Sequence, residues 1–531
     1  MKRNEIPRFY SLNNNDINEI YRERESKEIK HKMIYKMFTW IKVINIGDDQ
    51  DEFIKFTTMD DEEIQIKYAK NRTLKELVEF LEGCLVRKLK DNFKSFKKEY
   101  ETSTKSKGKK KPKDVINDLI MNKDNLGQGI FNCMFYLTMD NLEKSLAQPD
   151  EAFDKLFDLY NEIKDDKIVG FINDLKKDNI TKIQKRILIN LIFLFNYSKT
   201  IIESLIREDV TTNSDYNFAK LISPKIETDT YMLHFMSFAI EYGYEYVGLQ
   251  NNFLIMPDNE RMYLSFAHAI NYKNPLHIYG LNNGTKKETL KVLANLCGKR
   301  INYCFTTSYF SLESFNKIYN ANKKTGCWLC IDECQNINFD LIEILANRVA
   351  DIYRIMQSNG TEEEEFTPGE EKSTIKMSIF FYRELSYYAP FKSDSIPKVI
   401  KNYFRNIALP NMNYSFYLNE ILNNFGFENH EEITHKILYV MNYVVSKMNV
   451  MKQKNIIMLF LLKITDDINN NITTIDKKQF NLYLRNLIKE IFLHLLTEEE
   501  KEDFRKFLNE VFEMKDYKED IPHQHINESE E

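Results

Sequence analysis

The chain has 531 residues, with 74 Lys and Arg against 80 Asp and Glu, which gives a formal net charge of -6. This weakly acidic balance disfavours nucleic acid as a partner, because nucleic-acid-binding domains usually carry a strong positive field. Seven irregularly spaced cysteines and no secretory signal indicate a reduced intracellular compartment. The longest apolar runs, 187–195 and 456–462, are shorter than the roughly 18 residues of a membrane-spanning helix. We therefore expect a soluble protein with neither nucleic-acid nor membrane partners.

The first part of the chain, residues 1–223, is expected to be helical. Apolar residues recur at helical spacing, which predicts helices that each bury one face. The stretches with this pattern are 29–46, 74–96, 150–165 and 180–205. Residues 102–114 contain six lysines and are expected to form a basic, flexible linker.

Residues 224–413 alternate between strand-like and helix-like stretches, which is typical of an α/β sheet covered by helices. The expected strands are 248–256, 276–279, 302–306, 328–331 and 375–382. The expected helices are 260–270, 286–297, 312–319 and 339–356. The glutamate-rich stretch 360–372 is expected to be a solvated loop rather than a metal site, because adjacent carboxylates repel one another.

Residues 414–514 are expected to form a small helical subdomain. Its expected helices are 417–425, 431–448, 455–464, 478–496 and 498–512. The acidic tail, residues 515–531, is expected to be disordered.

A candidate phosphate loop lies between an expected strand and an expected helix. A working loop has the pattern G-x-x-x-x-G-K-[ST], in which glycines let backbone amides surround phosphate, the lysine meets the outer phosphates and the hydroxyl holds magnesium. Gly280 and Lys286 match this pattern. Thr285 replaces the second glycine, and Lys287 replaces the magnesium-binding hydroxyl. Gly284 belongs to the same candidate loop.

A second motif lies at residues 326–333, where apolar residues lead into Asp332 and Glu333 as in a Walker B strand. In such a strand the Asp would hold the magnesium shell and the Glu would polarise the attacking water. Asp332 is thus the candidate metal ligand and Glu333 the candidate catalytic residue. The interval from Lys286 to Asp332 suits a passage of strand, helix, strand, helix and strand.

Several further segments occur in the order found in dynein heavy chains. They are Tyr242-Gly243-Tyr244-Glu245-Tyr246-Val247-Gly248, Ile255-Met256-Pro257, Ile396-Pro397, Tyr403-Phe404-Arg405 and Asn424-Phe425-Gly426-Phe427-Glu428. Together with the two motifs, they make residues 207–432 resemble the first AAA+ module of a dynein heavy chain. More weakly, the N-terminal half resembles the C-terminal part of the dynein linker.

The resemblance implies a mixed, helix-rich α/β fold. It would comprise a helical linker-like N-terminal half, an AAA+ core of the phosphate-loop type and a small helical lid subdomain. It also implies a single module without the remaining ring modules, stalk or microtubule-binding tip. ATP or ADP is the expected cofactor, and Lys287 disfavours Mg²⁺. The residues implied in nucleotide binding are Gly280, Gly284, Thr285, Lys286, Lys287 and Asp332.

The residues that sense nucleotide in this family are altered. Leu385 aligns with an Asn that positions the lytic water, and Ile456 aligns with an Arg that reaches the terminal phosphate. Neither side chain can donate a hydrogen bond, and losing such donors slows catalysis by orders of magnitude. Arg405 matches an arginine that would serve the nucleotide of a neighbouring module. The resemblance therefore implies an inefficient ATPase.

Two hypotheses follow. In the first, the chain is a non-motor scaffold or accessory protein whose partners are dynein subunits or axonemal and microtubule-associated proteins. It would lie in the cytoplasm, on the cytoskeleton or in the cilium axoneme. In the second, it is a slow ATPase or a static nucleotide binder that uses Lys286 and Glu333. A truncated or divergent heavy-chain copy is a third possibility. The retained pair Asp332 and Glu333 favours the second hypothesis, whereas the altered loop and sensor residues favour the first.

Three cysteines, Cys327, Cys330 and Cys334, have the spacing C-x2-C-x3-C. A zinc site would need them on one side of the chain together with a fourth ligand. Successive strand residues face opposite ways, and no fourth ligand is nearby in the sequence. We therefore expect core or incidental cysteines.

Overall fold

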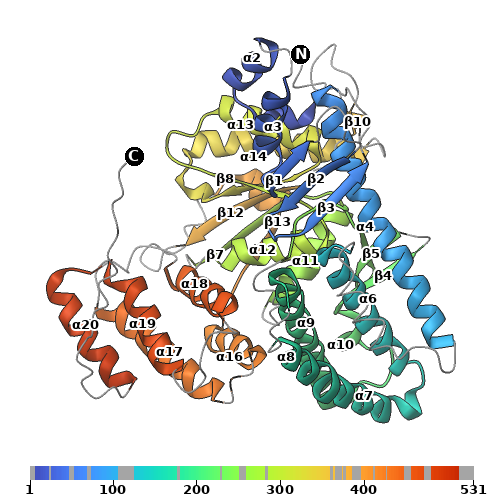
Figure 1. The fold of residues 1–531 in the computed structure, drawn as a ribbon. Coiled ribbons are helices and arrows are strands. Elements are labelled where there is room, and N and C mark those ends of the chain that lie inside the picture. The colour runs from blue at the N-terminus through green and yellow to red at the C-terminus, as the bar shows by residue number, and fades with distance from the viewer. Residues whose placement is uncertain are drawn as a thin grey trace. The chain divides into compact units, whose positions relative to one another are not determined.

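A computed structural model of the chain divides it into two compact units, Met1–Met412 and Asn413–Glu531. Figure 1 shows the order of the elements along the chain. The structure describes residues 6–22, 26–46, 53–67, 73–105, 125–175, 180–227, 230–249, 259–281, 285–358, 363–364, 373–374, 378–385, 396–410, 413–425, 427, 429–447, 456–471, 480–494 and 496–512.

The α/β part of the first unit is built on a five-stranded parallel sheet with the strand order β13-β7-β12-β9-β8. All five residues of β9 are buried, as expected for a strand with helices on both faces of its sheet. The strands are β7 (Leu276–Leu281), β8 (Ile301–Phe305), β9 (Trp328–Asp332), β12 (Ile379–Leu385) and β13 (Arg405–Ala408). The fold is thus mixed, helix-rich α/β, as the sequence predicts.

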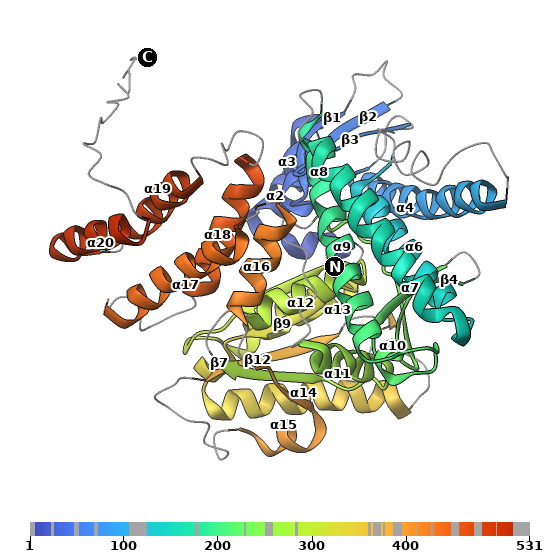
Figure 2. The ribbon, with the colours of Figure 1, turned by 90° about the horizontal axis from the view of Figure 1, so that it is seen from below.

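Helices α11 and α12 lie on one side of this sheet and α13 and α14 on the other (Figure 1), and α15 lies beside α14 (Figure 2). On the first face, the ring of Phe266 packs against Trp328 and Phe380 at centroid distances of 5.3 and 6.0 Å. On the second, Ile331 and Phe381 belong to a cluster of buried residues from α13, α14 and α15. The helices are α11 (Glu260–Asn271), α12 (Thr285–Leu296), α13 (Leu312–Thr325), α14 (Phe339–Ser358) and α15 (Lys398–Tyr403).

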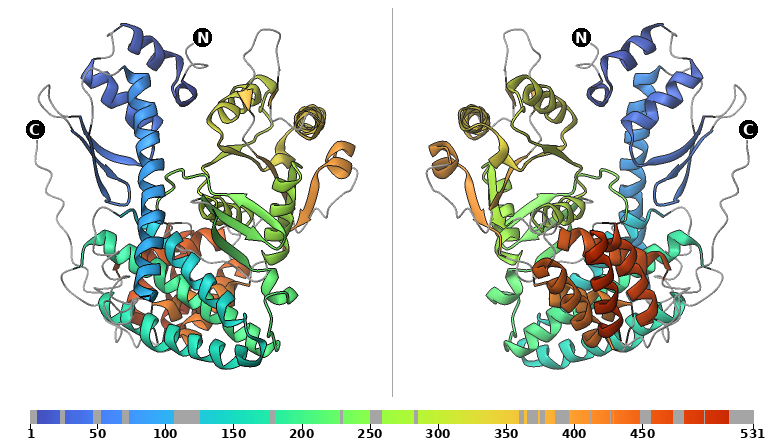
Figure 3. Two further views of the ribbon diagram at one scale, coloured as in Figure 1. Left: turned by 90° about the vertical axis from the view of Figure 1, so that its right-hand side faces the viewer. Right: turned by 90° about the vertical axis from the view of Figure 1, so that its left-hand side faces the viewer.

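Long helices dominate residues 74–207, as expected from their apolar periodicity. Figure 3 shows α4 as one continuous helix. The start of α9 is defined by a capping box, in which the Thr181 hydroxyl accepts from Gln184 N and the Gln184 side chain accepts from Thr181 N. The elements are α4 (Leu74–Lys105), α6 (Gly127–Ser145), η2 (Pro149–Glu151), α7 (Ala152–Asn161), the π-helix η3 (Glu162–Ile168), α8 (Val169–Leu175), α9 (Lys182–Arg207) and α10 (Tyr216–Ala219).

The prediction of one helix over 29–46 is wrong, and so is a wholly helical N-terminal region. Helix α3 ends at Met37, and Ile41–Ile46 forms the first strand of an antiparallel sheet with the order β1-β2-β3. Three of the six residues in this strand are isoleucine and one is valine, and β-branched side chains favour strands over helices. The elements are η1 (Pro7–Ser11), α2 (Asn14–Arg22), α3 (Lys27–Met37), β1 (Ile41–Ile46), β2 (Phe53–Thr58) and β3 (Glu63–Lys67).

A second antiparallel sheet, β4-β5-β6, precedes the α/β part and was not predicted from the sequence. Burial along its middle strand, Thr230–Phe235, alternates residue by residue, because one face of the strand is packed and the other is partly open. The strands are β4 (Ile222–Glu227), β5 (Thr230–Phe235) and β6 (Phe238–Glu241).

Residues 242–249 join the helical half to the α/β part. The Gln128 side chain on α6 donates to the Tyr242 hydroxyl at 2.6 Å and to Glu245 O at 2.8 Å, and it accepts from Val247 N at 2.9 Å. Asn132, one turn further along α6, donates to the same Tyr242 hydroxyl at 2.9 Å. Part of the segment 242–248, which resembles a dynein heavy chain, therefore forms a buried joint between these two parts.

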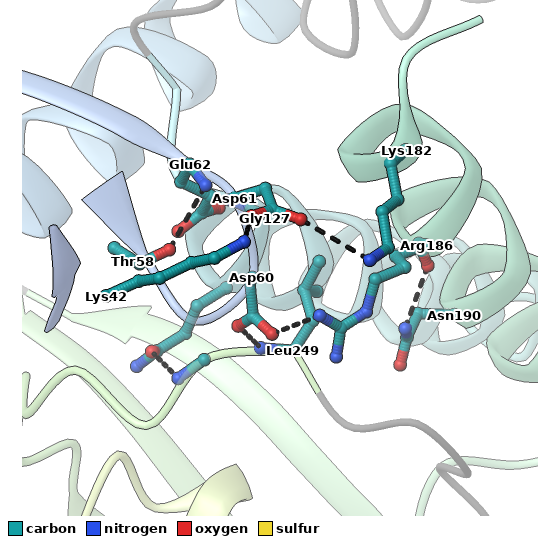
Figure 4. A network of polar contacts seen from close by, with 12 residues as sticks. Lys42, Thr58, Asp60, Asp61, Glu62, Gly127, Lys182, Arg186, Asn190 and Leu249 are labelled. Atoms are coloured by element: carbon teal, nitrogen blue, oxygen red, sulfur yellow. Dashed lines mark hydrogen bonds and ion pairs between the residues drawn. The ribbon is translucent and has the colours of Figure 1, made fainter. Parts of the chain in front are cut away.

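The turn between β2 and β3 also contacts residues of this joint (Figure 4). Asp60 accepts a hydrogen bond from Leu249 N at 2.9 Å and forms an ion pair with Arg186 of α9. Glu62 accepts from Gly127 N at 2.6 Å, at the start of α6. Two carboxylates of one turn thus hold three segments that are far apart in the sequence.

Glu245 makes this joint sensitive to pH. Burial raises the pKa of its carboxyl from 4.5 to about 7, although the charges of Lys299 and Arg8 oppose the shift. The folded state then keeps a proton that the unfolded state releases, so stability should fall as the pH rises from about 4.5 to about 7. Glu245→Gln still accepts the hydrogen bond from Arg300 N. Between pH 5 and pH 8 its free energy of unfolding should rise by about 2.5 kcal/mol relative to wild type, because each pKa unit corresponds to about 1.4 kcal/mol.

Urea unfolding at the two pH values measures this effect. Both tryptophans of the chain, Trp40 and Trp328, lie in the first unit, so their fluorescence reports on that unit alone. Glu241→Gln, an exposed neighbour, is the matched control and should follow wild type. Equal pH dependence in wild type and Glu245→Gln would contradict the expectation.

The second unit consists of five described helices. Its aromatic packing includes Phe427 against Phe480 at 4.1 Å and Phe492 against both Phe460 and Phe504, at 4.6 and 5.8 Å between centroids. The helices are α16 (Tyr414–Asn424), α17 (His430–Lys447), α18 (Ile456–Asn471), α19 (Phe480–Leu493) and α20 (Glu498–Val511), close to the predicted positions.

Some predicted segments lie wholly or partly outside the described residues. Of the expected basic linker, α4 includes residues 102–105 and the rest is outside. Of the glutamate-rich stretch, β10 (Glu363–Glu364) is described and pairs with β11 (Ser373–Thr374). Most of the strand expected at 248–256 and the whole tail 515–531 are outside. Among the helices that the structure describes, none has the length and apolar character required to cross a membrane.

Candidate nucleotide-binding site

The candidate residues gather at one edge of the parallel sheet. Gly280 lies near the end of β7, Asp332 ends β9 and Leu385 ends β12, and the ends of parallel strands meet at the same edge. In the strand register, Leu385 pairs with Leu281, directly after Gly280. Ligands of open α/β sheets bind at this carboxyl edge. The backbone therefore brings both sequence motifs and the altered sensor residue together.

The phosphate loop is described at its two ends. Gly280 is buried, and a Cβ there would lie 2.9 Å from Leu409 O, so the close approach of the chain after β13 requires a glycine. Lys286 is 2% exposed, and its Nζ lies 3.5 Å from Gly280 O. The candidate Gly284 lies outside the described residues. The candidate Thr285 is described only as the first residue of α12.

The Walker B residues are held by their backbone. Glu333 has left-handed dihedrals, with φ 53° and ψ 42°, and its N–H donates to Asp332 Oδ1 at 3.0 Å. The Thr306 hydroxyl donates to both Asp332 O and Glu333 O at 2.8 Å. The Glu333 carboxylate accepts from Asn336 Nδ2 at 2.8 Å. These contacts set the directions of the candidate metal ligand and the candidate catalytic residue.

The pKa of the Asp332 carboxyl is raised, although nearby positive charges oppose the shift. Burial raises the pKa of its carboxyl, and the nearby charge of Lys287 is the largest influence in the other direction. The hydrogen bond from Glu333 N and the charge of Lys286 act in the same sense as Lys287. Of the two adjacent lysines, Lys287 is thus the main internal counter-charge of Asp332.

Lys287 does not extend into open space. Its Nζ lies 4.9 Å from the ring centroid of Tyr303 and 4.5 Å from that of Phe305, both on β8. These are cation–π distances. The Tyr303 hydroxyl also donates to Lys287 O at 3.2 Å, so the first turn of α12 is tied to the strand through backbone and side chain.

Sequence reasoning missed the three residues on and after β8 that shape this site: Tyr303, Phe305 and Thr306. A signal was present, because two aromatic residues at alternate positions of one strand point to the same face. Their pairing with Lys287 depends on the order of strands in the sheet. That order is not written in any local pattern.

The remaining sensor residues lie apart from this edge or outside the described side chains. Arg405 is exposed and begins β13, and the start of a parallel strand lies at the opposite edge of the sheet from Gly280. Ile456 begins α18 of the second unit, and its side chain is outside the described part. Leu385 is placed by its backbone alone.

The three cysteines of the Walker B region are all buried. Burial raises the pKa of the Cys327 thiol to about 11 and that of Cys334 to about 12, so both are neutral thiols at physiological pH. Within the described residues, no cluster of His, Cys, Asp or Glu side chains is arranged to hold a metal ion.

The comparisons with known proteins agree with the resemblance. A family model described as the hydrolytic ATP binding site of the dynein motor region matches residues 242–529, more than half of the chain. Dynein axonemal heavy chain 2 of Mus musculus is 22% identical over 457 residues, which cover 84% of this chain and 10% of that protein. The dynein-1-beta heavy chain of the flagellar inner arm I1 complex of Chlamydomonas reinhardtii is 23% identical over 368 residues, 67% of this chain and 8% of that protein. Cytoplasmic dynein 2 heavy chain 1 of Mus musculus is 20% identical over 445 residues, 83% and 10% respectively.

The chain therefore spans about a tenth of the length of these relatives. The matched residues include the candidate loop, the Walker B strand and the five helices of the second unit. The predicted dynein resemblance is thus confirmed. The chain therefore belongs to the family that is defined by the hydrolytic ATP binding site of the dynein motor region.

Proposed function

We propose that this protein is a dynein-like module that holds ATP or ADP without efficient turnover and serves as a scaffold or accessory component of dynein-associated microtubule machinery. The observation that carries the proposal is the place of Leu385. It ends β12 beside the phosphate loop, in register with Leu281. A hydrocarbon side chain at this position cannot orient an attacking water.

Binding is supported by the retained end of the loop. Lys286 is buried within the first turn of α12, where the free N–H groups and the helix dipole favour anions. A nucleotide phosphate would form a charge-assisted hydrogen bond with its ammonium. The loop therefore keeps the main attraction for phosphate.

Slow turnover is supported by the surroundings of Glu333. Its carboxylate accepts from Asn336, and its backbone is held by Thr306. In an efficient ATPase this glutamate would act together with a second group that positions water. That group would be a hydrogen-bond donor at Leu385, and its loss alone typically costs about 100- to 1,000-fold in rate.

The partners are proposed from the relatives. Their printed names describe axonemal, flagellar inner-arm and cytoplasmic dynein heavy chains. We infer that the chain associates with dynein subunits or with axonemal and microtubule-associated proteins, in the cytoplasm, on the cytoskeleton or in the cilium axoneme. The buried joint of Tyr242 with Gln128 and Asn132 supports a scaffold role, because it couples the helical half firmly to the α/β part.

Calorimetric titration of the full chain with ATP and ADP, followed by a phosphate-release assay, tests the proposal. We expect micromolar binding and turnover indistinguishable from background. Leu385→Asn should raise turnover at least about 10-fold, because it restores a donor to the water-binding position. Leu385→Ala is the matched control and should not raise it. Absence of nucleotide binding would overturn the proposal that the chain binds ATP or ADP. Wild-type turnover near 1 per second or above would overturn the proposal that it holds the nucleotide without efficient hydrolysis.

A slow ATPase is the second candidate, and the retained pair Asp332 and Glu333 favours it. The same assay separates the two. Slow wild-type turnover that Glu333→Gln abolishes would support the ATPase and replace the static interpretation.

A further inference from the structure

The candidate site keeps the lysine that meets the outer phosphates, but it lacks the hydroxyl that would help to hold magnesium. A magnesium ion bound with a nucleotide requires octahedral oxygen ligands, usually one or two protein oxygens beside phosphates and waters. Of the two protein ligands that the motifs provide, Asp332 remains, but a lysine occupies the position of the hydroxyl. The residues present therefore do not fit the ion.

The Lys287 side chain is held against β8. Its Nζ lies over the rings of Tyr303 and Phe305, at 4.9 and 4.5 Å from their centroids. A divalent ion 4 Å from this ammonium would be repelled by about 8 kcal/mol at an effective dielectric of about 20, twice the value for two unit charges. Magnesium would thus have to displace the Lys287 ammonium from both rings.

We propose that Lys287 replaces the magnesium ion, so that the site binds ATP or ADP without metal. Lys286 and Lys287 follow one another in the first turn of α12, where they supply two positive charges beside the free N–H groups of the helix. The rings of Tyr303 and Phe305 hold the Lys287 ammonium in place before the nucleotide binds. This inference rests on the proposed nucleotide binding and adds its independence of metal.

The test is calorimetric titration of the full chain with ADP and ATP, once with excess Mg²⁺ and once with EDTA. We expect wild-type affinity in EDTA to equal that in Mg²⁺ within about threefold, or to exceed it. Lys287→Thr, which restores a hydroxyl, should lose at least about tenfold in EDTA and recover in Mg²⁺. Lys291→Ala removes an exposed lysine from the same helix and should change neither value.

A second variant leaves the helix untouched. Phe305 is 61% exposed, so Phe305→Ala should fold normally. It removes one of the two rings under Lys287 and should weaken binding in EDTA about threefold, as expected for one cation–π contact.

The outcomes separate this inference from the proposed function. Wild-type binding that falls more than tenfold in EDTA would overturn metal independence and leave nucleotide binding standing. Unchanged affinities in both Lys287→Thr and Phe305→Ala would also overturn it, because neither group would then contribute. No binding under either condition would overturn the inference together with the proposed function.

Discussion

Replacing Lys286 by alanine is expected to lower the affinity for ADP and ATP at least about 100-fold. Its side chain is 2% exposed, and its Nζ lies 3.5 Å from Gly280 O. A phosphate would form a charge-assisted hydrogen bond with it in surroundings from which water is largely excluded. Removing one partner of such a buried charge pair costs 2 to 5 kcal/mol in general, and about 3 kcal/mol corresponds to the expected loss.

Calorimetry of wild type, Lys286→Ala and Lys291→Ala measures this effect. Lys291 lies in the same helix, its side chain is 54% exposed, and it pairs with Glu288 at 3.9 Å, so its removal tests the loss of a lysine charge alone. The thermal midpoint without nucleotide should change little in both variants. Only Lys286→Ala should lose the stabilisation that nucleotide provides. If Lys286→Ala kept its affinity within threefold, the buried lysine would be a structural residue and the loop would not hold phosphate.

The α/β part of the fold was largely predictable because its signals are local. Central strands such as β9 are buried on both faces and appear in the sequence as short apolar runs. Helices such as α14 show a long 3.6-residue period. Turn residues separate the two, since Gly326 ends α13 with a left-handed conformation two residues before β9 begins. The alternation of elements then specifies a parallel sheet.

The errors near the N-terminus have a different cause. In residues 29–46, apolar side chains occur often enough to satisfy a helical period on both sides of Phe38. The competing signal is the β-branched content of Ile41–Ile46, which becomes decisive only when β2 supplies a pairing partner. The same holds for β5, whose alternating pattern becomes decisive only when β4 and β6 supply pairing partners.

At the candidate site, the sequence predicted positions but not contacts. The motif patterns placed Gly280, Lys286 and Asp332 correctly at the carboxyl edge of the sheet. The sequence also suggested that Lys287 would occupy the metal position. The actual partners, Tyr303 and Phe305, come from a strand that is adjacent to β9 only in the folded sheet. Contacts of this kind depend on strand order, which no pattern within one segment specifies.

The second large effect is expected at the turn between β2 and β3 (Figure 4). Asp60→Asn should lower the free energy of unfolding of the first unit by about 3 kcal/mol. The Asp60 carboxylate pairs with Arg186 and accepts from Leu249 N at 2.9 Å. An amide can keep one of these contacts, but it removes the negative charge that pairs with the Arg186 guanidinium, whose side chain is 24% exposed. Loss of one partner of a largely buried ion pair costs about 3 to 5 kcal/mol.

Asp61→Asn is the matched control, because it removes the same charge from the next residue. Asp61 pairs with Lys42 and with Lys182, the latter at 3.6 Å. The two lysine side chains are 50% and 72% exposed. Surface pairs of this kind contribute less than about 1 kcal/mol. Urea unfolding followed by tryptophan fluorescence reports on the first unit for both variants. Equal losses would mean that the turn contributes through its net charge alone. A loss confined to Asp60→Asn would mean that one carboxylate fastens the helical half of the chain to the segment that enters the nucleotide-binding module.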